Sequence, residues 1–347
     1  MNKINFLAGN EAKAIEFLEN ISPKDRVAIL SHTDLDGIVS AKVVSMFVKP
    51  KLLLFLDYED LRNGLSDKLR KNKVNKVIIS DLSINYIYVL RKINKFAEIL
   101  IIDHHEFKHD FNDAKTIFMN AKGYCAAYLC YYIISKIKDI SEIDWIVACS
   151  SISDFQYFNN TEFMEKTMKK YGDRFEVKGD YIRKDGKFWD LQYNLSLAIV
   201  YFKSKNKLEK VYLSFGTKFG DVGNLIKHSK IVQDEIDRNI EKFWKQRENF
   251  NDIYLWYFKQ KFPVSSILIN IISVKEPSKT FILIRAEGKY LHINARRQDG
   301  KVDLPVLLKK ATKGLKDADG GGHRKAAGAS ILLKDLDKFK ETLKKLS

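Results

Sequence analysis

Three short apolar runs in the first third of the chain each end abruptly in acidic residues or histidines. Val27 to Leu30 precedes Ser-His-Thr-Asp, Val77 to Ile79 precedes Ser-Asp, and Ile99 to Ile102 precedes Asp-His-His. Continuous apolar runs of this length are typical of strands buried on both faces, as in a parallel sheet. Helical stretches lie between them, for example Gly37 to Val48 and Asn85 to Phe96. The pattern therefore predicts an α/β domain with a parallel sheet.

The polar residues follow the predicted strands at their carboxyl ends, where open parallel sheets bind their ligands. The coincidence of three strand ends is stronger evidence for a site than any single acidic residue. Two further apolar helices are expected, from about Tyr124 to Ile137 and from about Ile143 to Ser150. The second ends near Asp154, which becomes a fourth candidate.

The second half of the chain changes character. Residues from about Asn160 to Gln260 are rich in lysine and aromatic side chains at helical spacing, which predicts a helical connector or insertion. Beyond it we expect a smaller α/β domain that consists of a strand meander, a helix, a glycine-rich loop, a further strand and a terminal helix. The meander is expected at Ser266 to Val274, Thr280 to Ala286 and Tyr290 to Ala295. The first helix is expected at Leu304 to Gly314, and the further strand at Ala329 to Leu333. The predicted divisions are 1–158, 159–260 and 261–347.

The charge balance favours a polyanionic partner. Lys and Arg number 60 against 44 Asp and Glu, a formal net charge of +16, and nucleic acid is the leading candidate for such a chain. Lysine-rich helix faces that only solvate the protein explain the same counts equally well. Charge alone therefore ranks substrates without selecting one.

The three cysteines, Cys125, Cys130 and Cys149, show no C-x-x-C spacing and have apolar neighbours. We expect reduced core residues of an intracellular protein, with no metal role. The N-terminus lacks a basic stretch followed by an apolar run, and no apolar segment reaches the roughly 18 residues of a membrane span. A soluble, cytoplasmic protein is expected.

The first polar segment is Ser31-His32-Thr33-Asp34-Leu35-Asp36-Gly37. The alternating residues His32, Asp34 and Asp36 can project into one cleft, and Gly37 permits a tight turn into the next helix. Two carboxylates so close repel each other unless a cation lies between them. A helix N-cap would explain one of these aspartates but not all three residues together.

The other polar segments supply Asp81, the triplet Asp103-His104-His105, and Asp154. Taken alone, Asp81 fits a helix cap better than a metal ligand. Adjacent histidines beside acidic groups suit a transition-metal site, because imidazole and carboxylate together match Mn, Fe or Zn. A surface histidine pair is the alternative for the triplet.

Together these segments resemble the motifs of the DHH phosphoesterase superfamily, which is named for its Asp-His-His triplet. The C-terminal part resembles the associated DHHA1-type domain, whose G-G-G-H and A-A-G are matched by residues 320–328. The H-x-D-x-D-G form of the first motif is similar to RecJ-like nucleases, including archaeal single-strand exonucleases. Inorganic pyrophosphatases and the usual bacterial nano-RNases place this histidine four residues before the first aspartate, whereas His32 is two before Asp34. Whether His32 binds a metal directly therefore stays open.

The resemblance implies a two-metal site in which Asp34 binds one ion, Asp36, His104 and Asp154 bind the second, and Asp81 bridges both. Two cations about 3.5–4 Å apart can activate a water and stabilise charge on phosphate oxygens. Mn²⁺ is expected, with Mg²⁺ or Co²⁺ as substitutes.

Two neighbours of these ligands are given other roles by the resemblance. His105 would face the scissile phosphate. Asp103 would orient its neighbours, since ligating imidazoles usually donate their second N–H to an oxygen.

In the second domain, Gly320, Gly321, Gly322 and His323 are expected to hold a substrate phosphate through backbone N–H groups and the imidazole. An arginine fork suits the same task, and the resemblance favours Arg296 over Arg297. Aromatic residues of the connector, as in Phe243-Trp244-Lys245, could stack on bases, but at helical spacing a place in the core is favoured.

The function expected is that of a metal-dependent exonuclease acting on single-stranded DNA or RNA. A phosphodiesterase for very short RNAs, nucleoside bisphosphates or cyclic dinucleotides is the nearest alternative. A second alternative is an inactive replication-associated binding protein of the same fold, which the full ligand set argues against. A replication or repair protein is a candidate partner, and no membrane partner is expected. The polarity of digestion, DNA against RNA, and the oligomeric state stay open.

Overall fold

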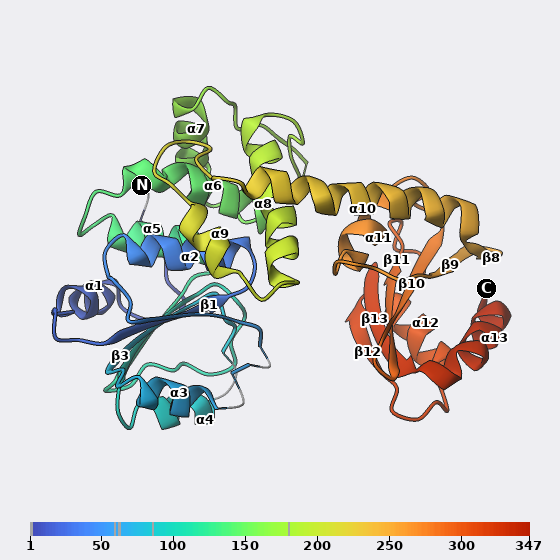
Figure 1. Cartoon of the computed structure of the whole chain (residues 1–347), viewed down its shortest axis with the longest axis horizontal. Helices are drawn as coiled ribbons and strands as arrows, with labels where there is room; N and C mark the ends of the chain where they lie inside the picture. The colour runs from blue at the N-terminus through green and yellow to red at the C-terminus, as the bar shows by residue number, and fades with distance from the viewer. Residues whose placement is uncertain (1–2, 59, 62–63, 85–86, 180) are drawn as a thin grey trace. The chain divides into compact units, whose positions relative to one another are not determined.

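The computed structural model describes residues 3–58, 60–61, 64–84, 87–179 and 181–347 (Figure 1). The chain separates into two compact units, Met1–Lys230 and Ile231–Ser347. No helix in the described part of the chain is long and apolar enough to cross a membrane.

The first unit is built on a five-stranded sheet in the order β2-β1-β3-β4-β5, in which every neighbouring pair is parallel. The strands are β1 (Val27–His32), β2 (Leu52–Leu56), β3 (Lys76–Ser80), β4 (Glu98–Asp103) and β5 (Thr116–Asn120). The three predicted strands are thus β1, β3 and β4, which are adjacent in the sheet. The predicted parallel α/β fold is confirmed, and β2 and β5 flank the strands that the sequence indicated.

Helices cover both faces of this sheet, which explains why its strands are apolar on both sides. Ile29 and Ile78 pack on one face with α1 and the group α2, α5 and α6, whereas Leu30 and Ile79 pack on the other with α3 and α4 (Figure 1). The helices are α1 (Glu11–Glu19), α2 (Leu35–Ser45), α3 (Leu65–Lys71), α4 (Ile87–Ile93), α5 (Ala126–Ile134) and α6 (Asp144–Ser153). Part of the helix predicted from Asn85, namely residues 85–86, lies outside the described residues.

The three cysteines are core residues, as the sequence predicted. Cys125, Cys130 and Cys149 are free and buried.

Gly37 permits the close approach of α2 to β1. A Cβ at Gly37 would lie 2.4–2.7 Å from backbone atoms of His32, so only glycine lets α2 start this close to β1. This close approach restricts the backbone of Thr33 and Asp34, which connect β1 with α2.

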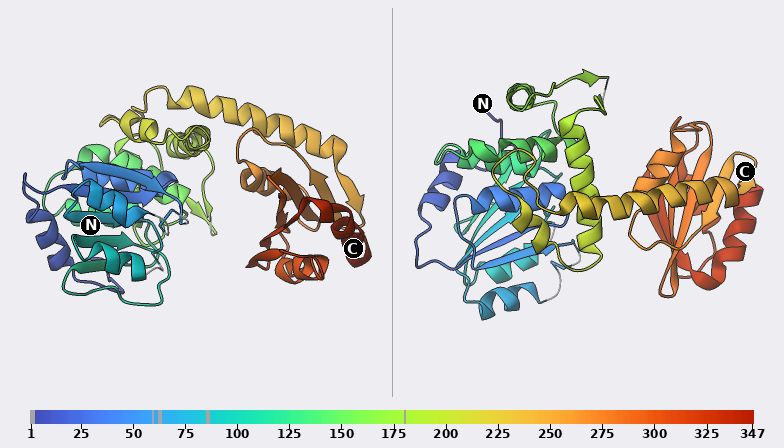
Figure 2. Two further views of the ribbon diagram at one scale, coloured as in Figure 1. Left: turned by 60° about the horizontal axis from the view of Figure 1, so that its bottom comes forward. Right: turned by 45° about the horizontal axis from the view of Figure 1, so that its top comes forward.

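Between α6 and β8 (Glu248–Phe250) the described residues form the helices α7 (Thr161–Lys170), α8 (Lys187–Lys203), α9 (Glu209–Ser214) and α10 (Leu225–Gln246). A two-stranded sheet, β6 (Val177–Lys178) with β7 (Tyr181–Ile182), lies between α7 and α8 in the chain. Figure 2 shows α10 as the long helix that ends shortly before β8.

The second unit holds a mixed six-stranded sheet in the order β12-β13-β11-β10-β9-β8. Its strands are β8 (Glu248–Phe250), β9 (Ile253–Tyr257), β10 (Thr280–Glu287), β11 (Tyr290–Arg296), β12 (Asp319–His323) and β13 (Ala326–Leu332), and its helices are α11 (Ser265–Ser273), α12 (Leu304–Ala311) and α13 (Leu336–Leu346).

The strand predicted at Ser266 to Val274 is wrong, because this segment forms α11. Its isoleucines favour a strand, but Leu268, Ile269 and Ile272 form one helical face that packs against Phe281 of β10. Packing of this face has overridden the intrinsic β preference.

The glycine-rich segment is an edge strand and not the predicted loop. Gly321 is paired with Gly328 of β13, and Gly322 with Ala327. A Cβ at Gly322 would lie 2.5 Å from the carbonyl oxygen of Ala326, and its φ of 137° also favours glycine. The glycines therefore allow β12 to lie close against β13.

Candidate metal centre

The carboxyl ends of β1, β3 and β4 bring the predicted ligands together. Three overlapping groups have potential ligand atoms within 4.8 Å of one another: His32, Asp34 and Asp81; Asp36, His104 and Asp154; and Asp81, Asp103, His104 and His105. The second group is the set that the family resemblance implied for one ion, and the first joins Asp34 and Asp81 with His32, whose role as a ligand the sequence left open.

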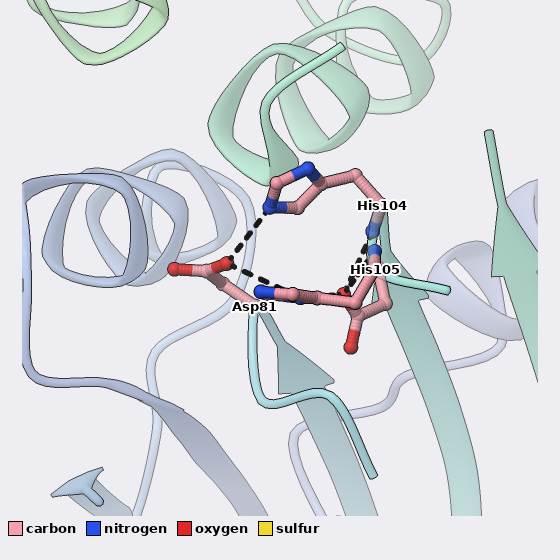
Figure 3. Close-up of side chains that lie close together, drawn as sticks. Asp81, His104 and His105 are labelled. Atoms are coloured by element: carbon pink, nitrogen blue, oxygen red, sulfur yellow. Dashed lines mark hydrogen bonds and ion pairs between the residues drawn. The ribbon is translucent and has the colours of Figure 1, made fainter. Parts of the chain in front are cut away.

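Asp81 lies between the two groups of ligands, and Figure 3 shows its carboxylate facing the rings of His104 and His105. Its Oδ1 lies 3.3 Å from Nε2 of His104 and 3.9 Å from Nδ1 of His105, and its Oδ2 lies 3.8 Å from Nδ1 of His32. The backbone of Asp81 is left-handed, with φ of 58°, a strained conformation of the kind that concentrates at functional sites. Oδ2 is buried and has no hydrogen-bond partner among the described residues.

An unpartnered buried carboxylate oxygen is costly unless a cation binds it. Burial, together with the negative charges of Asp36 and Asp34, raises the pKa of Asp81 well above its ordinary value. Oδ2 of Asp154 lies 3.6 Å from Nε2 of His104 and is likewise buried without a hydrogen-bond partner among the described residues. Burial with the same two charges raises the pKa of Asp154 to about 9. These carboxylates fit divalent cations, whose positive charge removes the mutual repulsion.

Asp34 has two roles at the start of α2. Its Oδ1 accepts a hydrogen bond of 3.0 Å from the backbone N–H of Gly37, which makes it the N-cap of the helix. Its Oδ2 lies 2.9 Å from Nδ1 of His32. Burial alone would raise the pKa of Asp34, but His32 and the Gly37 N–H lower it to about 2, so the carboxylate is ionised. The N-cap alternative and the ligand hypothesis thus apply to different oxygens of one side chain.

Asp36 is buried and joins three helices. Its carboxylate accepts hydrogen bonds from the backbone N–H groups of Ala126 at 2.7 Å and Ala127 at 2.9 Å, and from Oγ of Ser150 at 2.6 Å. It therefore caps α5, whose own N-cap residue makes no side-chain hydrogen bond. Oδ2 also lies 3.9 Å from Nε2 of His104, so Asp36 supports both the fold and the cluster.

Asp103 uses its oxygens to orient its neighbours. Oδ1 accepts hydrogen bonds from the backbone N–H of His104 at 2.7 Å and of His105 at 3.1 Å, and lies 2.7 Å from Nδ1 of His105. Oδ2 accepts from the backbone N–H of Ser83 at 2.8 Å. Burial alone would lower the pKa of His105, but Asp103 raises it above the ordinary value. His105 is therefore biased towards the positive form beside the cluster.

Asn120 and Asp57 belong to the same sheet edge and were not predicted. Nδ2 of Asn120, the last residue of β5, donates a hydrogen bond of 2.9 Å to the His105 carbonyl oxygen. Asp57 directly follows β2 and lies 3.9 Å from His32. Because Leu52–Leu56 is an apolar run ending in an acidic residue, the rule applied to the other strands would have indicated Asp57.

In the second unit, strand pairing places Arg296 and His323 on one face of the sheet. Arg296 is opposite Ala326, which is opposite His323. Nε of Arg296 is buried without a hydrogen-bond partner among the described residues. Arg297, in contrast, is 6% exposed and bonded to Asp299 and Thr280. Arg296 is thus the arginine with hydrogen-bonding capacity left for a ligand.

An open pocket of about 510 Å³ lies on this unit's sheet, and its lining includes Arg285, His292, Asn294, Gly321 and Ser330. The glycine of this set belongs to the motif that the sequence indicated. The side chains of β10 and β11 were missed, because no short pattern marks them.

Two aromatic residues of the predicted connector, Phe243 and Trp244, pack in a hydrophobic core, as the sequence analysis favoured. Phe243 is fully buried and packs beside Phe281, and Trp244 is partly buried against the same cluster. Phe243 therefore has no exposed face for a base.

Two family models match the chain: the N-terminal domain of the DHH family over residues 26–152 and the DHHA1 domain over residues 255–347. The chain belongs to the DHH family and combines a DHH domain with a DHHA1 domain. No match was found among curated proteins.

Solved structures show the same fold. RecJ from Thermus thermophilus in complex with Mn²⁺ has a TM-score of 0.70 at 14% identity, over 99% of this chain and 55% of that one. An exonuclease RecJ bound to manganese has a TM-score of 0.68 at 14% identity, over 98% and 94%. CDC45 from Entamoeba histolytica has a TM-score of 0.56 at 11% identity, over 96% and 97%. The fold is RecJ-like, and the chain spans just over half of the Thermus RecJ chain.

Proposed function

We propose that this protein is a metal-dependent phosphodiesterase that acts as an exonuclease on single-stranded DNA or RNA. The observation that carries the proposal is the cluster around Asp81, in which buried carboxylate oxygens of Asp81 and Asp154 have no hydrogen-bond partner among the described residues. Carboxylates with imidazoles are the donor set that Mn²⁺ accepts. The relatives of this fold include RecJ structures holding Mn²⁺, one of them described as an exonuclease.

Two sets of residues would hold the ions. His32 and Asp34 would hold one, and Asp36, His104 and Asp154 the other. Asp81 would contribute to both, because its Oδ2 lies 3.8 Å from Nδ1 of His32 and its Oδ1 lies 3.3 Å from Nε2 of His104. When bound, such ions lower the pKa of a water and neutralise charge on the phosphate.

The remaining groups act on the substrate. His105, held by Asp103, presents a ring whose pKa is raised, so it can donate to a phosphate oxygen. In the DHHA1 domain, Arg296 and His323 would hold a phosphate beside the exposed backbone of Gly320, Gly321 and Gly322. The net charge of +16 supports a polyanionic substrate.

Two alternatives use the same fold. A phosphodiesterase for very short oligonucleotides, nucleoside bisphosphates or cyclic dinucleotides would need the same cluster and differ in substrate length. The second alternative is an inactive, replication-associated binding protein with a replication or repair partner, and CDC45 is a structure that shares the fold. The donor set described above favours an enzyme, because a pure binding protein has no need of it.

The test is digestion of end-labelled DNA and RNA strands of graded length with Mn²⁺, Mg²⁺, Co²⁺ or chelator. We expect release of mononucleotides from one end of long single strands, dependent on added metal. Asp81→Asn is the matched inactive control. Cleavage confined to the shortest oligonucleotides would select the first alternative. Strand binding without cleavage under any metal would select the binding role.

A further inference from the structure

Asp57 occupies a position beside the metal centre that the ligand sets do not include. It directly follows β2, and its Oδ1 lies 3.9 Å from Nε2 of His32. Within the described part of the chain, no other carboxylate lies within 4.0 Å of that nitrogen. This separation exceeds the hydrogen-bonding distance of about 3 Å, so a hydrogen bond requires the two side chains to move closer together.

The Asp57 carboxylate is itself held in place. Its Oδ1 accepts hydrogen bonds from Oγ1 of Thr33 at 2.7 Å and from Nζ of Lys203 at 2.6 Å. Its backbone N–H donates to Asp60 at 2.8 Å. Burial alone would raise the pKa of Asp57, but the hydrogen bonds from Lys203 and Thr33 lower it, so the carboxylate is ionised. Lys203 ends α8, far along the sequence, and also contacts Oγ1 of Thr33 at 2.7 Å.

The two nitrogens of the His32 ring face different partners. Nδ1 lies 2.9 Å from Oδ2 of Asp34 and 3.8 Å from Oδ2 of Asp81, yet it is buried without a hydrogen bond to the described residues. The ring of Tyr58 stacks on the imidazole at 4.9 Å with an interplanar angle of 20°. Stacking restricts the plane of the ring, and the distances show that Nδ1 faces Asp34 and Asp81 while Nε2 faces Asp57.

We propose that Asp57 is the positioning residue that presents Nδ1 of His32 to the metal centre, with Lys203 and Thr33 holding the carboxylate in place. In this arrangement Nε2 carries the proton and donates it in a hydrogen bond to Asp57. A carboxylate that accepts from the second nitrogen of a ligating histidine fixes its tautomer and raises its basicity. The proposal rests on the metal-dependent function above, and it assigns His32 a direct role as an Nδ1 ligand.

The first test is the affinity of the whole chain for Mn²⁺, measured by titration with electron paramagnetic resonance of the free ion. Asp57→Asn should weaken binding of one ion about 10- to 100-fold. Lys203→Met should weaken it in the same direction but less, because the carboxylate remains. The control is Glu209→Gln, which removes an exposed carboxylate from the wall of the same pocket as Asp57 and should leave the affinity unchanged. Unchanged affinity in Asp57→Asn would overturn the proposal.

The second test asks whether Asp57 acts through His32. In a His32→Gln background, Asp57→Asn should cause no additional loss of Mn²⁺ affinity, because the residue that it positions is gone. An undiminished loss in that background would show that Asp57 acts by another route. Thermal unfolding in chelator verifies that each variant is folded.

The third test reads the tautomer directly. With ¹⁵N-labelled histidine and Zn²⁺ as a diamagnetic probe, the His32 resonances should show a metal-bound Nδ1 and a protonated Nε2. The His32→Gln variant assigns the signals. A metal-bound Nε2 would contradict the proposal. None of these readouts needs a substrate, so a chain that binds metal as described but cleaves no nucleic acid would refute the proposed function and leave this inference standing.

Discussion

Oδ1 of Asp81 lies 3.3 Å from Nε2 of His104, although the two residues follow different strands of the sheet. The contact exists because β3 and β4 are parallel neighbours, paired from Lys76 with Glu98 to Ser80 with Ile102, so their carboxyl ends reach the same edge. Asp81 and His104 then extend from that edge, and the left-handed backbone of Asp81 turns its carboxylate into the cluster.

Asp81→Asn should abolish hydrolysis and leave the fold intact. Asparagine tolerates the left-handed backbone, whereas Asp81→Ala would add a backbone cost of about 1–2 kcal/mol. The metal-free Asn variant should be at least as stable as the parent protein, because it removes a buried, repelled carboxylate. Calorimetry with and without Mn²⁺ checks this: the rise in Tm caused by Mn²⁺ should largely disappear. A normal rise together with normal turnover would exclude the bridging role.

Asp36→Ala should destabilise the metal-free protein by about 2–4 kcal/mol. The change removes the cap of α5 and leaves buried N–H groups of Ala126 and Ala127 without acceptors. Asp154→Ala removes a side chain with an unpartnered oxygen and should cost less than about 1 kcal/mol. Urea unfolding in chelator compares the two variants. Equal losses would show that Asp36 has no structural role beyond the cluster.

The metal-free protein should lose stability as the pH rises from about 5 to 9. The folded pKa of Asp154, about 9, is above the unfolded value of about 4, so between these values the folded state binds more protons than the unfolded state. The same protons compete with metal, so the affinity for Mn²⁺ should rise over this range. Asp154→Asn should flatten the pH dependence of unfolding measured in chelator. An equally steep curve in that variant would mean that Asp154 titrates normally.

Arg296→Ala and Arg297→Ala should separate binding from folding. Arg296→Ala should weaken binding of an uncleavable single strand and reduce the salt slope by about 1, with little change in stability. Arg297→Ala should lower stability, because it breaks the pairing with Asp299 and the bond to Thr280.

His323→Ala should weaken strand binding without loss of bound metal. Metal loss with unchanged strand affinity would show that the DHHA1 domain has a different task.

The sequence could predict the strands whose apolar runs end in acidic residues, because a buried parallel strand and its ligands leave a local pattern. It could not predict the contact of Lys203 with Asp57, since these residues are 146 positions apart and meet only through folding. The second role of Asp36 was hidden for the same reason, because its partners Ala126 and Ser150 come from distant helices. In α11 the local preference of isoleucine pointed to a strand, and packing on the sheet decided for a helix.

The most direct test is the anomalous scattering of Mn²⁺ in crystals of the chain grown with that ion. We expect two peaks about 3.5–4 Å apart on either side of the Asp81 carboxylate, one near His32 and Asp34, the other near His104 and Asp154. A single peak, or peaks that do not contact Asp81, would contradict the two-metal account.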